Sequence, residues 1–144
     1  MTHDRPPIET ATDPIRSTSD MRQRWRALMG ELGFGQSMLW VGFVGPDRRM
    51  PKLLIDLPRP ASPRSDLVDP LLDELVRVLD DMEPGTTVAF LLTGPGHGPL
   101  STLHRRWATE LTAAAAQRAV PLKPIFGAND DMLIEVDSAL KQAG

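Results

Sequence analysis

The sequence contains no cysteine and no tyrosine, and only 5% of its 144 residues are aromatic. Without thiols the chain has no disulfide, no cysteine nucleophile and no cysteine-ligated zinc or iron–sulfur site. Its few rings come from phenylalanine and tryptophan, which leaves little material for the stacking platforms that hold single-stranded nucleic acids. Several classes of catalytic and nucleic-acid-binding protein are therefore disfavoured.

Positive charge and long apolar runs are also scarce. Sixteen basic residues stand against 19 acidic ones, and residues 70–100 carry five acidic side chains against one basic. A nucleic-acid-binding domain normally has a basic stripe, so we expect no nucleic-acid partner. No apolar run reaches the roughly 18 residues of a membrane span, and no signal-peptide pattern opens the chain. We expect a cytoplasmic protein with no membrane segment.

The length of the chain fits one domain preceded by a tail. Residues 1–18 contain three prolines and almost no apolar periodicity. Such a composition cannot offset the entropy lost on ordering, and it predicts a disordered tail. Residues 19–144 are then expected to form a single α/β domain.

Three segments have the apolar spacing of amphipathic helices. The first begins at Ser19, a capping residue, and ends before Gly33; the second begins at Asp69–Pro70; the third begins after Ser101. Apolar residues recur three and four positions apart in each segment. Methionine and tryptophan give the first helix an apolar stripe that can pack on its own sheet or on another copy.

Strands are predicted between these helices. The candidate segments are residues 37–45, 52–57, 86–93, 122–126 and 132–136. A turn sequence between the first two predicts an antiparallel hairpin, and the helix between the third and fourth predicts a parallel crossover. The expected fold is α/β: a single-domain three-layer sandwich with a mixed sheet of four or five strands, in which an N-terminal hairpin is followed by a β-α-β crossover.

Two loops at the carboxyl edge of the parallel strands are the best candidates for a binding site, because open α/β sheets bind ligands there. They are residues 93–99 and 127–131. The first loop leads into a helix N-terminus, which favours anions, but it matches neither nucleotide-binding glycine pattern. Its glycines also fit a stiff, tight connection with no ligand. The candidate ligand-binding residues are Gly94, Gly96, His97, Gly98, Ser101, His104, Asn129 and Asp130.

A metal site is an alternative interpretation of the same loops. His97 and His104 need a third ligand, which only Asn129, Asp130 or Asp131 supplies from the neighbouring loop. The spacing of the histidines matches no metal motif, and a histidine on an apolar helix stripe more often bonds to a nearby carbonyl or loop. We therefore expect no metal, no cofactor and no catalytic residue. The second histidine is expected to lie half-buried on the inward face of its helix.

Two other polar features point away from catalysis. Asp56 alternates with apolar neighbours on the second strand, so its carboxylate needs a partner if that face is covered and is merely solvated at a sheet edge, which we favour. The sequence contains no Gly-x-Ser-x-Gly elbow, and Ser37 begins a strand rather than a strand-to-helix turn. Hydrolysis by a serine triad is therefore not expected.

Two stretches carry a resemblance to a known group of proteins. Residues 32–43, and residues 90–99 followed by Trp107-Ala108 and the 121–131 segment, are similar to uncharacterised actinobacterial α/β proteins. The resemblance covers most of residues 19–136 and implies the fold without implying a function.

A shorter resemblance is to JAB-type metalloproteases and their DNA-repair-associated relatives. His97-Gly98-Pro99, Ser101 and the helix after them carry it. That family needs a paired histidine, a serine and an aspartate, whereas the first histidine position here is glycine or proline. The sequence therefore departs from the metal motif of that family at its first histidine position.

Two functions are compatible with these features. The first is a non-catalytic cytoplasmic module that acts through a protein partner or by self-association, because motifs for catalysis are missing and the first helix carries its apolar stripe. The alternative is a small anionic ligand or a metal-dependent site at loops 93–99 and 127–131. In that site His97 donates to an anion, and Asp130 or Asp131 holds a cation or accepts a proton.

Overall fold

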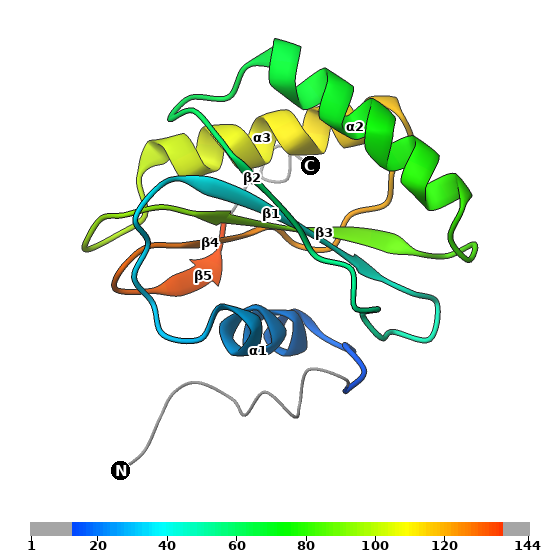
Figure 1. The fold of residues 1–144 in the computed structure, drawn as a ribbon, viewed down its shortest axis with the longest axis horizontal. Helices are drawn as coiled ribbons and strands as arrows, with labels where there is room; N and C mark the ends of the chain where they lie inside the picture. The colour runs from blue at the N-terminus through cyan, green and yellow to red at the C-terminus, as the bar shows by residue number, and fades with distance from the viewer. Residues whose placement is uncertain (1–12, 137–144) are drawn as a thin grey trace.

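The computed structural model describes residues 13–136, which form a three-layer α/β sandwich (Figure 1). Helix α1 lies on one face of the sheet, and helices α2 and α3 lie on the other. The elements are α1 (Thr18–Met29), β1 (Met38–Val44), β2 (Ile55–Pro58), α2 (Ser65–Asp80), β3 (Thr87–Thr93), α3 (Thr102–Gln117), β4 (Phe126–Ala128) and β5 (Leu133–Glu135). The predicted fold class is confirmed.

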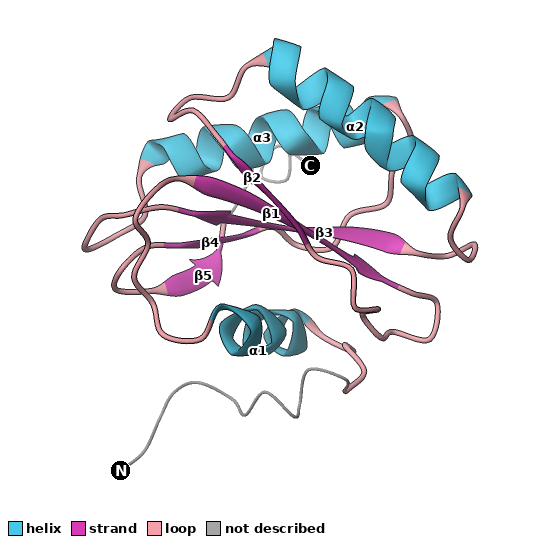
Figure 2. Cartoon of the chain, in the orientation of Figure 1, coloured by secondary structure: helices cyan, strands magenta, loops and turns pink. Residues whose placement is uncertain are grey.

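The sheet is mixed and has the strand order β2-β1-β3-β4-β5 (Figure 2). Strand β1 pairs antiparallel with both β2 and β3, whereas β3 and β4 are parallel and are joined through α3. The predicted hairpin and the predicted crossover are therefore both present. The two long strands, β1 and β3, are apolar on both parities because helices cover both faces of the sheet.

Helix α1 packs its apolar stripe on the sheet of its own chain. Met21 and Trp25 are fully buried, in one cluster with Leu91 and Phe126. Of the two surfaces that the sequence allows for this stripe, the structure uses the intramolecular one. Leu28, Met29 and Leu32 of the same stripe are partly buried against this cluster.

The boundaries of α1 differ from those predicted. The helix is capped by Ser17, whose Oγ accepts from Asp20 N at 3.0 Å, rather than by Ser19. It ends at Gly30, which has φ +69°, a conformation that glycine adopts readily. Ile15 is buried and its N–H donates to Arg48 O at 2.7 Å. Residues 13–18 of the predicted tail thus pack on the domain, and residues 1–12 lie outside the described residues.

Helix α2 begins four residues before the predicted start, at Ser65, and Pro70 lies inside it. The extra turn places Val68 in the core, where it is 2% exposed. Burial of Val68 therefore outweighs the local start signal at Asp69–Pro70. It also outweighs the backbone hydrogen bond that Pro70 removes from the helix interior. The predicted start at Asp69 was therefore wrong.

Strand β4 begins where the predicted strand ends. Pro124 interrupts residues 122–126, and a proline cannot donate to a strand ladder. Only an isolated bridge joins Leu122 to Val88, and the ladder with β3 forms over Phe126–Ala128 instead. The predicted turn accordingly moves to residues 129–132, before β5.

Both edges of the sheet are protected against pairing with another strand. Edge strand β2 ends in Pro58, which has no N–H, and carries the exposed Asp56. This position confirms the solvated interpretation of Asp56. At the other edge, Arg22 Nε of α1 donates to Leu133 O of β5 at 2.9 Å. Strand addition is therefore disfavoured at either edge.

None of the helices within residues 13–136 is long and apolar enough to cross a membrane.

Candidate functional site

The two predicted loops meet at the carboxyl ends of β3 and β4. Gly94 N donates to Ala128 O at 3.2 Å, and Asp130 N donates to Gly96 O at 2.9 Å. Parallel strands bring these ends to one edge, beside the first turn of α3 (Figure 1). The structure thus places the two loops and the start of the helix together.

The aspartates of the second loop accept hydrogen bonds from backbone N–H groups that would otherwise be available to an anion. Asp130 accepts from Phe34 N at 3.0 Å and from Gly96 N at 3.1 Å. Asp131 Oδ2 accepts from Gly98 N at 2.6 Å. These backbone hydrogen bonds are the main reason that the pKa of each carboxyl lies below its ordinary value. The backbone N–H groups of Gly96 and Gly98 are therefore already hydrogen-bonded to carboxylates of the chain itself.

Asn129 also joins the loops. It is 4% exposed, its Nδ2 donates to Gly98 O at 2.9 Å, and its Oδ1 accepts from Asp131 N and Met132 N. Both ends of the amide are engaged with backbone groups. The residue closes the turn before β5, which is a structural role.

His97 lies at the tip of the first loop and its side chain is 79% exposed. Its Nδ1 lies 3.0 Å from Asp131 Oδ1, and its Nε2 lies 3.9 Å from Asp130 Oδ2. The hydrogen bond to Asp131 is the main cause that raises the pKa of His97. The structure therefore gathers His97 with the two aspartates. Within residues 13–136, no three His, Asp or Glu side chains are arranged to hold a metal ion.

His104 belongs to a different group, under the first turn of α3. It is 9% exposed, so it is buried rather than half-buried as predicted. Ser101, the N-cap residue, does not cap the helix through its side chain; its Oγ lies 3.2 Å from His104 Nδ1. A Cβ added to Gly127 would lie 3.0 Å from His104 Cδ2, so the ring packs directly on the backbone of β4.

The other ring nitrogen of His104 has no partner. Its Nε2 is buried and makes no hydrogen bond to the described residues. Burial, and then the positive charge of Arg59, lower the pKa of His104 from 6.5 to about 4. Most buried polar side-chain atoms in folded proteins have a hydrogen-bond partner, so the unsatisfied nitrogen of this neutral imidazole is unusual.

Arg59 is the residue at this edge that the sequence reasoning missed. It follows β2 and is 9% exposed; Nε donates to Met38 O at 3.0 Å and Nη2 donates to Thr93 O at 2.9 Å. Its guanidinium lies 5.8 Å from the ring centre of Trp107. Burial lowers its pKa to about 10. In the described part of the chain, no carboxylate forms an ion pair with Arg59.

A concavity of about 260 Å³ opens between the first turn of α3 and strand β5. Its lining includes the buried His104 and the N-terminal residues of the helix. The lining residues are Leu100, Ser101, Thr102, His104, Arg105, Ile134, Glu135 and Val136. Two of the predicted site residues, Ser101 and His104, therefore belong to the lining of this concavity.

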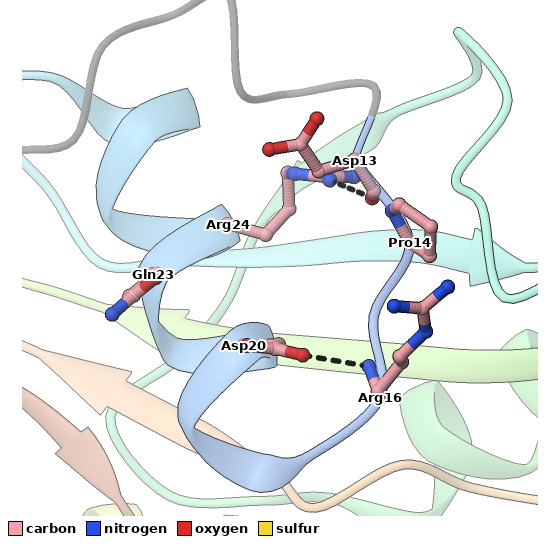
Figure 3. Close-up of a pocket in the computed structure, with 6 residues that line it drawn as sticks. All are labelled: Asp13, Pro14, Arg16, Asp20, Gln23 and Arg24. Carbon is pink, nitrogen blue, oxygen red and sulfur yellow. Dashed lines mark hydrogen bonds between the residues drawn. The ribbon is translucent and has the colours of Figure 1, made fainter.

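A second cavity, of about 350 Å³, lies where the chain enters α1 (Figure 3). Arginine and aspartate side chains line it together. Arg24 Nη2 donates to Asp13 O, and Asp20 Oδ2 accepts from Arg16 N at 2.8 Å. These bonds join residues 13–16 to the helix, so the polar groups of this cavity anchor the segment that precedes α1.

Comparison with protein-family models, with curated proteins and with solved structures gives no match for the chain. The similarity to actinobacterial proteins gains no support from these comparisons. The function has to be inferred from the geometry of the site.

The buried imidazole predicts a loss of stability in mild acid. The pKa of His104 is about 4 in the folded chain and returns to its ordinary 6.5 on unfolding. Between pH 6.5 and 4 the unfolded chain therefore binds the extra proton, and the folded state loses at most about 3 kcal/mol as the pH falls.

Urea unfolding of the wild type and of His104→Gln at pH 7, 5.5 and 4 measures this effect. We expect the free energy of unfolding of the wild type, relative to that of His104→Gln, to fall as the pH falls over that interval. His97, whose raised pKa acts in the opposite direction, is present in both proteins and cancels in the difference. Parallel curves for the two proteins would contradict the assignment.

Proposed function

We propose that this chain is a non-catalytic α/β binding module for a small anionic ligand, and that the anion binds at the first turn of α3. The observation that carries the proposal is His104, a residue that is 9% exposed and belongs to the lining of a concavity, and whose Nε2 has no hydrogen-bond partner within residues 13–136. This proposal keeps the predicted alternative of a small anionic ligand. It places the anion beside Ser101 and His104 instead of at the tips of the two loops.

The charge around the concavity favours an anion. The backbone N–H groups of the first turn of α3 receive no side-chain cap from Ser101, and the helix dipole adds positive potential there. Arg59 is a buried cation near enough to His104 to lower the pKa of the imidazole. A bound anion would supply the negative charge that no described carboxylate gives to Arg59.

The hydrogen-bonding groups also suit an acceptor. When the Ser101 hydroxyl donates to Nδ1, the proton of the neutral imidazole resides on Nε2. The Nε2–H is then a buried donor that lacks an acceptor, a state that costs about 1–3 kcal/mol. An anionic oxygen would satisfy this donor together with the free N–H groups of the helix.

Thermal unfolding with sodium acetate or inorganic phosphate tests the proposal, with sodium chloride at matched ionic strength as the reference. We expect either anion to raise the Tm of the wild type, because a ligand at 100 times its Kd adds about 2.7 kcal/mol of stability. His104→Gln should remove the increase. His97→Gln, at the loop tip, is the matched control and should retain it.

The outcomes separate the two places for the site. An increase that is lost in His97→Gln and kept in His104→Gln would place the anion at the loop tips and overturn the proposal. No increase in the wild type with either anion would overturn anion binding altogether.

Interaction with a protein partner or with a second copy stays a prediction. The side chains that support it are now the exposed Leu53, Leu54 and Leu67, since Met21 and Trp25 of the α1 stripe are buried. Light scattering at micromolar concentration distinguishes a self-associating chain from a monomer.

A further inference from the structure

We infer that His97, Asp130 and Asp131 form a pH-sensitive latch that holds the glycine-rich loop 94–99 to the turn between β4 and β5. The loop connects β3 to α3 and contains three glycines. None of residues 95–99 is buried, so this stretch has no side chain anchored in the core. Segments with few buried contacts open locally at low cost in free energy. The polar contacts with the turn therefore hold the loop in place.

The two carboxylates bind the backbone of the loop. Gly96 N donates to Asp130 Oδ2 at 3.1 Å, and Gly98 N donates to Asp131 Oδ2 at 2.6 Å. Asp130 Oδ1 also accepts from Phe34 N at 3.0 Å, which joins the loop between α1 and β1 to the same turn. These backbone bonds keep the pKa of each carboxyl below its ordinary value. Both carboxylates therefore stay charged in mild acid, and His97 is the member of the cluster whose charge changes near neutral pH.

The imidazole of His97 contacts both carboxylates, and these contacts depend on its charge. Its Nδ1 lies 3.0 Å from Asp131 Oδ1, and its Nε2 lies 3.9 Å from Asp130 Oδ2. A neutral imidazole carries a proton on one nitrogen only, so its other nitrogen presents a lone pair to a carboxylate. The imidazolium carries a proton on both nitrogens. The latch is consequently strongest when His97 is protonated.

The latch weakens as the pH rises. The hydrogen bond with Asp131, followed by the charges of Asp131 and Asp130, raises the pKa of His97 above its ordinary 6.5 in the closed loop. In the open loop the ring titrates at its ordinary pKa. The contribution of the ion pair is therefore fully present below pH 6.5 and is lost as the pH rises through the raised pKa. The side chain is 79% exposed, so salt screens the contact and the effect is confined to the loop.

An NMR titration of the full chain between pH 5 and 9, in low-salt buffer without added ligand, tests the inference. The signals are the His97 ring protons and the solvent-exchange rate of the Gly98 amide, corrected for its intrinsic pH dependence. In the wild type we expect the ring to titrate above pH 6.5. Across that midpoint, protection of the amide should fall by up to about fivefold.

Two aspartate variants make the test specific. In Asp131→Asn, we expect the midpoint of the His97 ring to return toward 6.5 and the corrected exchange rate of the Gly98 amide to become independent of pH. Asp56→Asn, at an exposed carboxylate of edge strand β2 that is not among the charges acting on His97, is the matched control. It should leave both signals as they are in the wild type.

Two results would overturn the latch. If the ring titrates near pH 6.5 in the wild type, or if Asp131→Asn leaves its midpoint unchanged, His97 is not coupled to the carboxylate. If the ring titrates at a raised pKa but the protection of the Gly98 amide is the same on both sides of the midpoint, the pair forms without holding the loop. Neither result bears on the anion proposed at the first turn of α3, because the titration contains no ligand.

Discussion

Replacement of Trp25 by alanine is expected to lower the free energy of unfolding by about 3–5 kcal/mol, the usual loss for a buried aromatic side chain. Trp25 is fully buried between α1 and the sheet, in the cluster that contains Ala89 and Leu91 of β3. In the described chain α1 is the only helix on this face (Figure 1). Truncation leaves a cavity that the closely packed side chains around it cannot fill. Urea denaturation followed by circular dichroism measures the loss.

A matched control comes from the opposite layer. Leu67 of α2 is 45% exposed, so Leu67→Ala should change the stability by no more than about 0.5 kcal/mol. If Trp25→Ala also left the stability nearly unchanged but dissociated an oligomer, the stripe of α1 would be an interface between copies. That result would contradict the packing of α1 on its own sheet.

The layers of this fold could be predicted because periodicity alone encodes them. Strands β1 and β3 are apolar on both parities, and such strands need cover on both faces. The spacing of Met21 and Trp25 marks the helix that supplies one cover. The hairpin follows from the turn sequence after β1, and the parallel crossover follows from the helix between β3 and β4.

Element boundaries were less predictable, because tertiary burial decides them. Asp69–Pro70 is a strong local start signal, yet the turn before it is helical since Val68 enters the core. Ile15 lies in a proline-containing segment with almost no periodicity, yet it is buried in the cluster under α1, and its N–H donates to the distant Arg48 O. Neither the core residues around Val68 nor Arg48 can be identified from the short stretch of sequence that surrounds Val68 or Ile15.

The candidate site was half predictable for the same reason. Ser101 and His104 are adjacent to a helix start and could be listed from the sequence. The capture of the glycine N–H groups by Asp130 and Asp131 depends on contacts 33 and 34 residues apart. Arg59 lies 34 residues from the carbonyl of Thr93 that it binds, and an arginine in a proline-rich loop carries no signal of burial.

The second large effect is expected for Arg59→Met, which should cost about 2–3 kcal/mol of stability. The substitution keeps an unbranched apolar side chain against Trp107 but leaves the carbonyls of Met38 and Thr93 without their donor. Unsatisfied buried carbonyls cost about 1–3 kcal/mol each, and part of this is offset because a charge no longer has to be buried. Arg64→Met, in the same loop but at an arginine whose side chain is 62% exposed, is the control.

The decisive measurement for Arg59 is the titration of His104, which a purely structural role would leave unchanged. Arg59 is one of the two causes that lower the pKa of His104 to about 4, the other being burial. Removal of the cation should therefore raise that pKa toward 6.5, and NMR of the ring protons in the folded variant reports it directly. The same variant should bind acetate more weakly, because the positive potential behind the imidazole is gone. An unchanged His104 titration in folded Arg59→Met would mean that the two groups are not electrostatically coupled, and the anion site would lose its cation.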